Sequence, residues 1–223
     1  MVTAETVFQL KIHLCDVSPM VWRRVLTEAS TSIAELHAII QAVMGWEDLH
    51  LHQFRIHGKT YGIHRDGGMS FSDDPDQVRL CDFKPCKRER FLYEYDMGDL
   101  WQHEIRLERI LPLEPRKRYP VCTGGHGDCP PEDCGGPSGF RALMEELASS
   151  LLEAREDALL VARRLLDFYQ GGPRPTYDDE EFVDAMERMN QRLENAPVPF
   201  TRREVNAALR KLIKEVRCTS ASE

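Results

Sequence analysis

The spacing of apolar residues changes along the chain, and this change constrains the fold more than any other feature. Over residues 6–15 polar and apolar side chains alternate, and the apolar side is formed by Phe8, Leu10, Ile12 and Leu14. A period of two is typical of a strand that buries one face. From about residue 141 the apolar residues instead recur every three or four positions, as in amphipathic helices. The sequence therefore predicts a sheet-rich part followed by a helical part.

The sheet-rich part contains one early helix. A second strand over residues 20–27 follows the turn at Ser18-Pro19. Ser32 and Glu35 have the spacing of a capping box, which begins a helix, and Gly45 ends it. The remaining predicted strands cover residues 51–57, 60–63, 91–96 and 101–110. We therefore predict an α+β domain over residues 1–150, with a largely antiparallel sheet, a packed helix and the order β-β-α-β-β-β-β.

Residues 151–223 are predicted to form an all-helical extension. One helix continues to the break at Gly171-Gly172-Pro173, a second begins near residues 178–181, and Thr201 with Glu204 repeats the capping-box pattern before a third. The last helix is locally basic, through Arg202, Arg203, Arg210, Lys211, Lys214 and Arg217. Such a helix could bind DNA, or its basic side chains could be the solvated side of a helix packed on the core.

The charge of the chain limits its partners. With 29 basic and 37 acidic residues, the formal net charge is -8, which excludes a general coat for nucleic acid and leaves the basic last helix as the one predicted contact. No apolar run approaches the ~18 residues of a membrane span, and no signal peptide is visible. We therefore expect a cytoplasmic protein without membrane association, whose partner is an unknown protein or a small ligand.

Three of the seven cysteines gather in one glycine- and proline-rich segment. Cys122, Cys129 and Cys134 have C-x6-C-x4-C spacing, and His126 lies between the first two. Thiolate and imidazole ligands of this number suit a tetrahedral structural zinc. Two other interpretations stay open, namely a tight loop with buried thiols and a reactive thiol. A separate pair, Cys81 and Cys86, could join the site only if the sheet brought the two loops together.

Two histidines lie two positions apart on a predicted strand. His50 and His52 would then share a face, about 6–7 Å apart. This spacing suits half of a metal site or two imidazoles beside a cleft. Because Phe54 continues the same face, His52 could equally be a histidine at the edge of the core.

A predicted hairpin contributes the remaining candidates. Asp96 and Asp99 flank Gly98 at its turn, and Trp101 and His103 share a face of its second arm. The carboxylates with His103 could bind a divalent ion or perform acid–base chemistry. Turn chemistry explains the two aspartates equally well, since aspartate accepts hydrogen bonds from turn amides.

Four segments together resemble one protein family. They are VWRRVL (21–26), MGWEDLHLHQFRI (44–56), FLYEYDMGDLWQHEI (91–105) and CPPEDCGGPSGF (129–140). In this order they resemble the Ri-plasmid ORF-three-like family, whose members often lie on plasmids and insertion sequences. Met97 departs from the family, which generally has an aromatic residue there. The resemblance covers roughly residues 6–150 and implies no established activity.

Three functions follow from these observations. The first is a non-enzymatic ligand- or partner-binding module with a cleft formed by the candidates from His50 to His103, and with a structural zinc in the cysteine segment as an option. The second is a metal-dependent, hydrolase-like enzyme that uses the same histidines and aspartates. The third is a DNA-associated transposon passenger protein, although neither a nucleophilic serine with an arginine cluster nor a basic DNA-binding module is recognisable.

Overall fold

The computed structural model describes the backbone of residues 6–63 and 70–219, and the side chains of these ranges up to residue 214. Its centre is a seven-stranded sheet with the order β4-β3-β5-β6-β1-β2-β7, in which all neighbours are antiparallel. The strands are β1 (Thr6–Leu14), β2 (Trp22–Glu28), β3 (His52–Ile56), β4 (Lys59–Tyr61), β5 (Arg90–Tyr95), β6 (Trp101–Pro112) and β7 (Val121–His126). A short 3-10 turn, η1, covers Leu80–Phe83.

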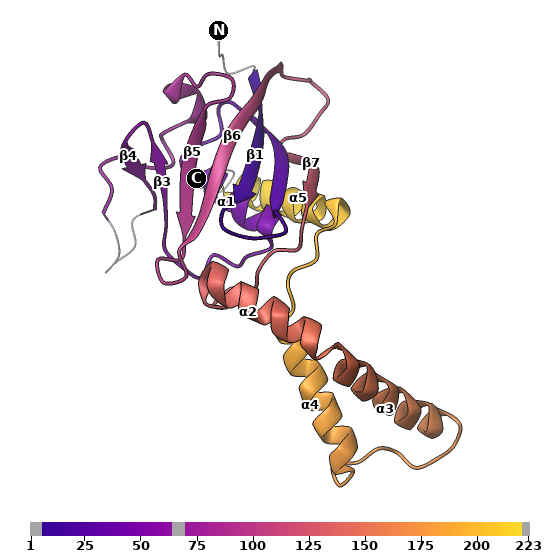
Figure 1. The fold of residues 1–223 in the computed structure, drawn as a ribbon. Helices are drawn as coiled ribbons and strands as arrows, with labels where there is room; N and C mark the ends of the chain where they lie inside the picture. Colours follow the sequence, from indigo (N-terminus) through magenta and orange to yellow (C-terminus); the bar gives the residue numbers. More distant parts are fainter. Residues whose placement is uncertain (1–5, 64–69, 220–223) are drawn as a thin grey trace. The chain divides into compact units, whose positions relative to one another are not determined.

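Two helices cover one face of this sheet. They are α1 (Ile33–Met44) and α5 (Arg202–Thr219), which lie against the same side of the strands in Figure 1. The alternate apolar residues of β1 point into this layer and are fully buried, as are Leu36 and Ile40 of α1 and Leu209 of α5. The opposite face of the sheet carries mostly polar side chains, together with a small apolar cluster of Val7, Leu26 and Tyr119. The main core therefore lies between one face of the sheet and two helices.

The predicted limits of α1 are confirmed in atomic detail. Ser32 Oγ accepts the backbone N–H of Glu35, and the Glu35 carboxylate accepts the backbone N–H of Ser32 at 2.8 Å. At the other end, Gly45 is left-handed with φ 86°, a conformation that glycine adopts without steric cost. These caps fix where α1 ends and hence where the following segment, residues 46–51, leaves the core.

The remaining helices are α2 (Gly136–Ser149), α3 (Leu151–Tyr169) and α4 (Glu180–Glu194). Contacts divide the chain into two compact units, of which the second is Ser138–Pro197 and the first contains the residues before and after it. This division differs from the predicted boundary at residue 150, because α5 packs with α1 and β7 and so belongs to the first unit.

The second unit is stabilised by a charged contact between two of its helices. Asp157 of α3 accepts hydrogen bonds from Arg188 at 2.7 Å and from Arg192 of α4. The two guanidinium groups lower the pKa of Asp157 to about 2.

Within the described residues, no helix has both the length and the apolar character that crossing a membrane requires.

The α+β class and the predicted element order are confirmed, with one addition. The segment 121–126, predicted as part of an irregular cysteine loop, forms the edge strand β7 and pairs with β2. The apolar alternation there is interrupted by Gly124 and Gly125, which weakened the strand signal.

Candidate functional site

Three of the predicted segments meet at the turn between β5 and β6. Asp96 begins that turn in a left-handed conformation, with φ 56°. Its Oδ1 accepts the backbone N–H groups of Gly98 at 2.9 Å and Asp99 at 3.3 Å. These bonds fix the orientation of the Asp96 carboxylate through Oδ1, and Oδ2 faces His50 instead.

The segment that follows Cys129 closes onto this turn. The backbone N–H of Gly135 donates to Asp99 Oδ2 at 3.0 Å. A Cβ atom at Gly136 would lie only 2.4 Å from the carbonyl oxygen of Asp99, so the close approach requires glycine. Asp99, predicted as a cleft residue, is thus a residue that joins two loops.

The segment after α1 is held by the same loops. The Tyr95 hydroxyl accepts the backbone N–H groups of Leu49 at 3.0 Å and His50 at 3.3 Å, and it donates to the carboxylate of Glu132. Burial and the neighbouring Glu132 charge raise the pKa of Tyr95. Trp46 Nε1 donates to the carbonyl of Pro130 at 2.9 Å. All three segments are therefore fixed relative to one another.

Their convergence forms what we call the loop cluster, His50, Asp96 and Asp133. His50 Nε2 lies 3.1 Å from Asp133 Oδ1 and 3.8 Å from Asp96 Oδ2. One donor atom from each residue falls within 4.8 Å of the other two, a spacing that could hold a metal ion. The cluster reaches the surface, since the side chain of Asp133 is 68% exposed while that of Asp96 is 10% exposed.

A second group with similar chemistry, the core cluster, consists of His37, Asp48 and His52. His37 is buried and uses both ring nitrogens: Nδ1 is 2.8 Å from the Tyr93 hydroxyl and Nε2 is 2.9 Å from Asp48 Oδ1. The His52 ring stacks on it at 3.5 Å with an angle of 6°. His52, predicted either beside a cleft or at the edge of the core, lies in the core.

Trp101 and His103 also lie in the core. Both are 0% exposed, because their face of β6 points toward α1. Burial lowers the pKa of His103 to about 3, so that the ring stays neutral near pH 7. Its two ring nitrogens and Trp101 Nε1 are buried and have no hydrogen-bond partner among the described side chains. The structure therefore places these two candidates away from any surface on which a substrate could bind.

The four predicted zinc ligands are not brought together. Within the described side chains, the groups that place three donor atoms within 4.8 Å of one another contain no cysteine and no His126. Cys122 and His126 lie at opposite ends of β7, four residues apart, which corresponds to about 13 Å along a strand. The unpredicted strand thus separates residues that a loop could have gathered.

A buried arginine organises this region instead. Arg23 is 1% exposed and donates to the carbonyls of His126 and Gly127, each at 3.0 Å, and to that of Val43 at 2.9 Å. The ring of Phe200 lies 4.2 Å from its guanidinium carbon. Burial lowers the pKa of Arg23, and its charge interacts with the nearby thiols of Cys122 and Cys129. The guanidinium of Arg23 therefore supplies a positive charge inside this loop.

The thiols of the cysteine segment are protonated near neutral pH. Burial raises the pKa of Cys122 and of the fully buried Cys129, and it raises the pKa of the half-buried Cys134 to about 11. A reactive cysteine needs a lowered pKa, so this environment favours structural thiols. Cys81 lies in η1 and Cys86 in the segment that follows it, and neither belongs to a three-donor group of the described residues.

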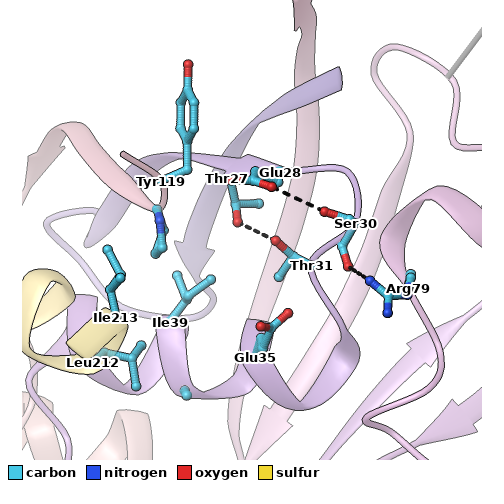
Figure 2. A pocket seen from close by; sticks show the side chains of 12 residues that line it. Thr27, Glu28, Ser30, Thr31, Glu35, Ile39, Arg79, Tyr119, Leu212 and Ile213 are labelled. Carbon is cyan, nitrogen blue, oxygen red and sulfur yellow. Dashed lines mark hydrogen bonds between the residues drawn. The ribbon is translucent and has the colours of Figure 1, made fainter. Parts of the chain in front are cut away.

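Figure 2 shows a pocket of about 230 Å³ between the start of α1 and α5. Its polar groups are largely used within the protein. Thr27 and Thr31 join their hydroxyls at 2.7 Å, and Arg79 donates to the carbonyl of Ser30. Glu35, at the same pocket, caps α1. The pocket therefore offers few polar groups to a ligand, and the loop cluster is the better candidate site.

Two kinds of residue escaped sequence reasoning. Asp133 lies inside the fourth motif, between cysteines that carry the stronger ligand signal, although its Pro-Glu-Asp-Cys-Gly context is typical of a turn that presents a carboxylate. His37 and Asp48 belong to the helix and the turn after it, and only the fold reveals their pairing with His52.

The basic last helix has the predicted two-sided pattern. Val205 and Leu209 are buried, and the exposed side carries Arg202, Arg203, Arg210, Lys211 and Lys214. The side chain of Arg217 lies outside the described residues. This geometry is common to both interpretations of the helix, so DNA binding there stays a prediction.

Comparisons with known proteins identify the family. Residues 6–183 match the family described as plasmid pRiA4b ORF-3-like protein. The chain is 34% identical over 158 residues to Uncharacterized protein y4hQ of Sinorhizobium fredii, covering 69% of this chain and 79% of y4hQ. It is also similar to the crystal structure of a protein of unknown function, MM3350 of Methanosarcina mazei Go1, with a TM-score of 0.61 and 37% identity over 71% of this chain and 90% of that chain. The resemblance predicted from the four motifs is thereby confirmed: the chain belongs to the plasmid pRiA4b ORF-3-like family.

Proposed function

We propose that the chain is a non-enzymatic binding module whose ligand is a divalent cation, held by His50, Asp96 and Asp133. The observation that carries this proposal is the position of His50 Nε2. This nitrogen is buried and faces two carboxylate oxygens at 3.1 and 3.8 Å, yet it forms a hydrogen bond with neither. An ion between the three groups would satisfy all of them.

The separations suit ligands of one ion. Metal–nitrogen and metal–oxygen bonds of ~2.0–2.2 Å place neighbouring ligand atoms roughly 3.0–3.5 Å apart. The separation of 3.1 Å between His50 Nε2 and Asp133 Oδ1 lies within this range, and the separation of 3.8 Å to Asp96 Oδ2 lies slightly above it. One imidazole and two carboxylates suit zinc or manganese better than calcium, which prefers six to eight oxygens.

The surrounding loops support a fixed site. Asp96 is held through its other oxygen by two backbone N–H groups, and the backbone of His50 is held by Tyr95. Asp133, like Asp96, has a left-handed backbone, with φ 58°. Residues in such conformations persist only where the surroundings hold them, and they gather at functional sites.

The same cluster gives the metal-dependent enzyme its one supporting observation. Three protein ligands leave a coordination position open for water, and the exposure of Asp133 lets solvent reach it. The enzyme, however, needs a general acid or base, and His103, predicted for that role, is 0% exposed. For this reason we prefer the binding module.

The proposal is tested by calorimetric titration of the chelator-treated chain with Zn²⁺ and, separately, Mn²⁺. We expect one equivalent to bind to the wild type. Asp133→Asn and His50→Gln should each weaken binding at least about tenfold, as loss of a ligand does. The protein loaded with the metal ion should hydrolyse p-nitrophenyl acetate and p-nitrophenyl phosphate no faster than buffer alone.

Two control variants make the result specific. Asp16→Asn changes an exposed aspartate with nearly the same φ, 59°, outside the cluster. His126→Gln removes the histidine of the predicted cysteine site. Both should bind the ion like the wild type. If the wild type binds neither ion, or if Asp133→Asn binds as tightly as Asp16→Asn, the proposal is wrong.

A further inference from the structure

The sheet face opposite α1 and α5 carries an unusual row of like charges. In the strand register, Lys11 of β1 lies directly opposite Arg24 of β2 on one side and Arg106 of β6 on the other. Arg106 in turn lies opposite Arg90 of β5. Four neighbouring strands thus place four cations in one line. Like charges directly opposite on a sheet are destabilising, so such a row calls for anions.

The ends of the row are neutralised by the protein. Arg24 binds Glu108 through two nitrogens, at 2.6 and 3.0 Å, and Arg90 pairs with Glu104 at 2.9 Å. A bulge between β1 and β6 brings Glu108 to Arg24, since the register shifts at Gln9. These glutamates therefore account for the outer two cations only.

A groove beside the centre of the row contains cations that no glutamate of the described residues neutralises in this way. It has a volume of about 520 Å³ and is lined by Gln9, Arg24, Lys87, Arg88, Arg106, Glu108 and Arg109. In the part of the chain that the structure describes, neither Arg106 nor Arg109 forms a salt bridge, and neither do Lys87 and Arg88 of the loop before β5. Among the described residues that line the groove, the one carboxylate is that of Glu108, which already accepts hydrogen bonds from Arg24 and Gln9.

One atom in the groove needs an acceptor in particular. Arg106 Nε is buried and has no hydrogen-bond partner within the described residues. A buried N–H of a charged group without an acceptor is costly. An anion in the groove would accept it and would separate the positive charges of Arg106, Arg109 and Lys87.

We propose that this groove binds an anion with two or more linked phosphate groups. Arginine matches phosphate through paired N–H donors, and several arginines on rigid strands can engage successive phosphates. Four uncompensated cations exceed what one carboxylate or a single phosphate can neutralise. The concentration of positive charge in a chain of net charge -8 makes the groove distinct from the rest of the surface. The groove is separate from the loop cluster and does not depend on a bound cation.

The test uses tripolyphosphate as the probe, titrated into the full chain by calorimetry with EDTA present. We expect binding at a single site that weakens as salt rises. Arg106→Gln and Arg109→Gln should each weaken it about tenfold. Because Arg106 lies within the sheet, Lys87→Gln, in an exposed loop, provides a variant that leaves the strands intact and should also weaken binding.

Arg116→Gln is the matched control, because Arg116 is exposed and lies outside the groove. The affinity of this variant for tripolyphosphate should equal that of the wild type.

A second experiment measures the binding of a labelled thymidine oligonucleotide by fluorescence anisotropy. If the oligonucleotide binds, is displaced by tripolyphosphate and is weakened by the same variants, the phosphates are those of a nucleic acid. If only tripolyphosphate binds, they belong to a free polyphosphate. Absence of binding to both probes at low salt, or equal affinity in Arg109→Gln, Lys87→Gln and Arg116→Gln, would overturn the proposal.

Discussion

The loop cluster and the core cluster contain the same kinds of donor but differ in what those donors already do. In the core cluster, both nitrogens of His37 are bonded within the protein and its ring stacks on His52. In the loop cluster, His50 Nε2 faces two carboxylates without a hydrogen bond, and Asp133 is exposed. The comparison teaches that a histidine such as His37, with both ring nitrogens bonded, has a structural role, whereas the unbonded His50 Nε2 makes the loop cluster the place where we propose a ligand.

The largest expected effect comes from breaking the core cluster. His37→Ala removes the bonds to Asp48 and Tyr93 and leaves the buried Tyr93 hydroxyl with fewer partners. We expect a loss of roughly 3 kcal/mol in the free energy of unfolding, measured with urea. The matched variant His50→Ala should lose under about 1 kcal/mol. Equal losses in both would remove the distinction between the clusters.

The next effect tests the loop cluster through linkage. If the cation binds only the native state, a concentration about 100 times its Kd should raise the free energy of unfolding by about 2.7 kcal/mol. Asp133→Asn should abolish most of this gain, whereas His37→Ala, although less stable, should keep it. Thermal unfolding with and without Zn²⁺ measures both. A gain that survives Asp133→Asn would place the ion elsewhere.

His103 extends the comparison to a histidine that is fully buried. Because burial lowers its pKa to about 3, the unfolded chain binds a proton below about pH 6.5 that the native chain does not. Its contribution to stability is therefore complete above about pH 6.5 and falls by about 1.4 kcal/mol per pH unit below it, or roughly 2 kcal/mol by pH 5.

Urea unfolding at several pH values tests this directly. His103→Leu should lose that part of the pH dependence. The packing that the variant loses should be offset, because it no longer buries ring nitrogens that lack a hydrogen-bond partner among the described residues. His126→Gln, which changes an exposed histidine on β7, should keep this pH dependence. Identical pH profiles for His103→Leu and the wild type would contradict the assignment of His103 as a neutral core residue.

The smallest effect separates the loop cluster from the cysteine segment. Cys134 is half-buried, so Cys134→Ser should lower the free energy of unfolding by about 0.5–1 kcal/mol through loss of packing. Its affinity for Zn²⁺ should not change. A large loss of affinity would instead make the cysteine a ligand and weaken the case for Asp133.

The sequence was most informative where one local interaction decides the structure. Alternation predicted β1, and the Ser32–Glu35 capping box predicted the start of α1, because both depend on neighbours in the chain. The strand β7 escaped prediction because glycines interrupt its pattern and the pairing with β2 stabilises it. Likewise, the packing of α5 with α1 depends on residues far apart in sequence.

The candidate site was predictable only in part. The motifs supplied His50 and Asp96, and the structure brings both into the loop cluster. They could not show that β7 separates Cys122 from His126, or that the guanidinium of Arg23 already lies in that loop. Which donors converge depends on three loops that meet only in the folded chain.

After Pro197 the chain returns to the first unit, and this return determines what a cut in the chain would do. Cys129 and Val198 exchange backbone hydrogen bonds at 2.9 and 2.8 Å, and α5 follows in contact with α1. The helices of Ser138–Pro197 are thus an insertion whose two ends both belong to the first unit. A proteolytic nick within that insertion would yield two fragments that stay associated, because the contacts of α5, and not the covalent chain, would hold the second fragment on the sheet.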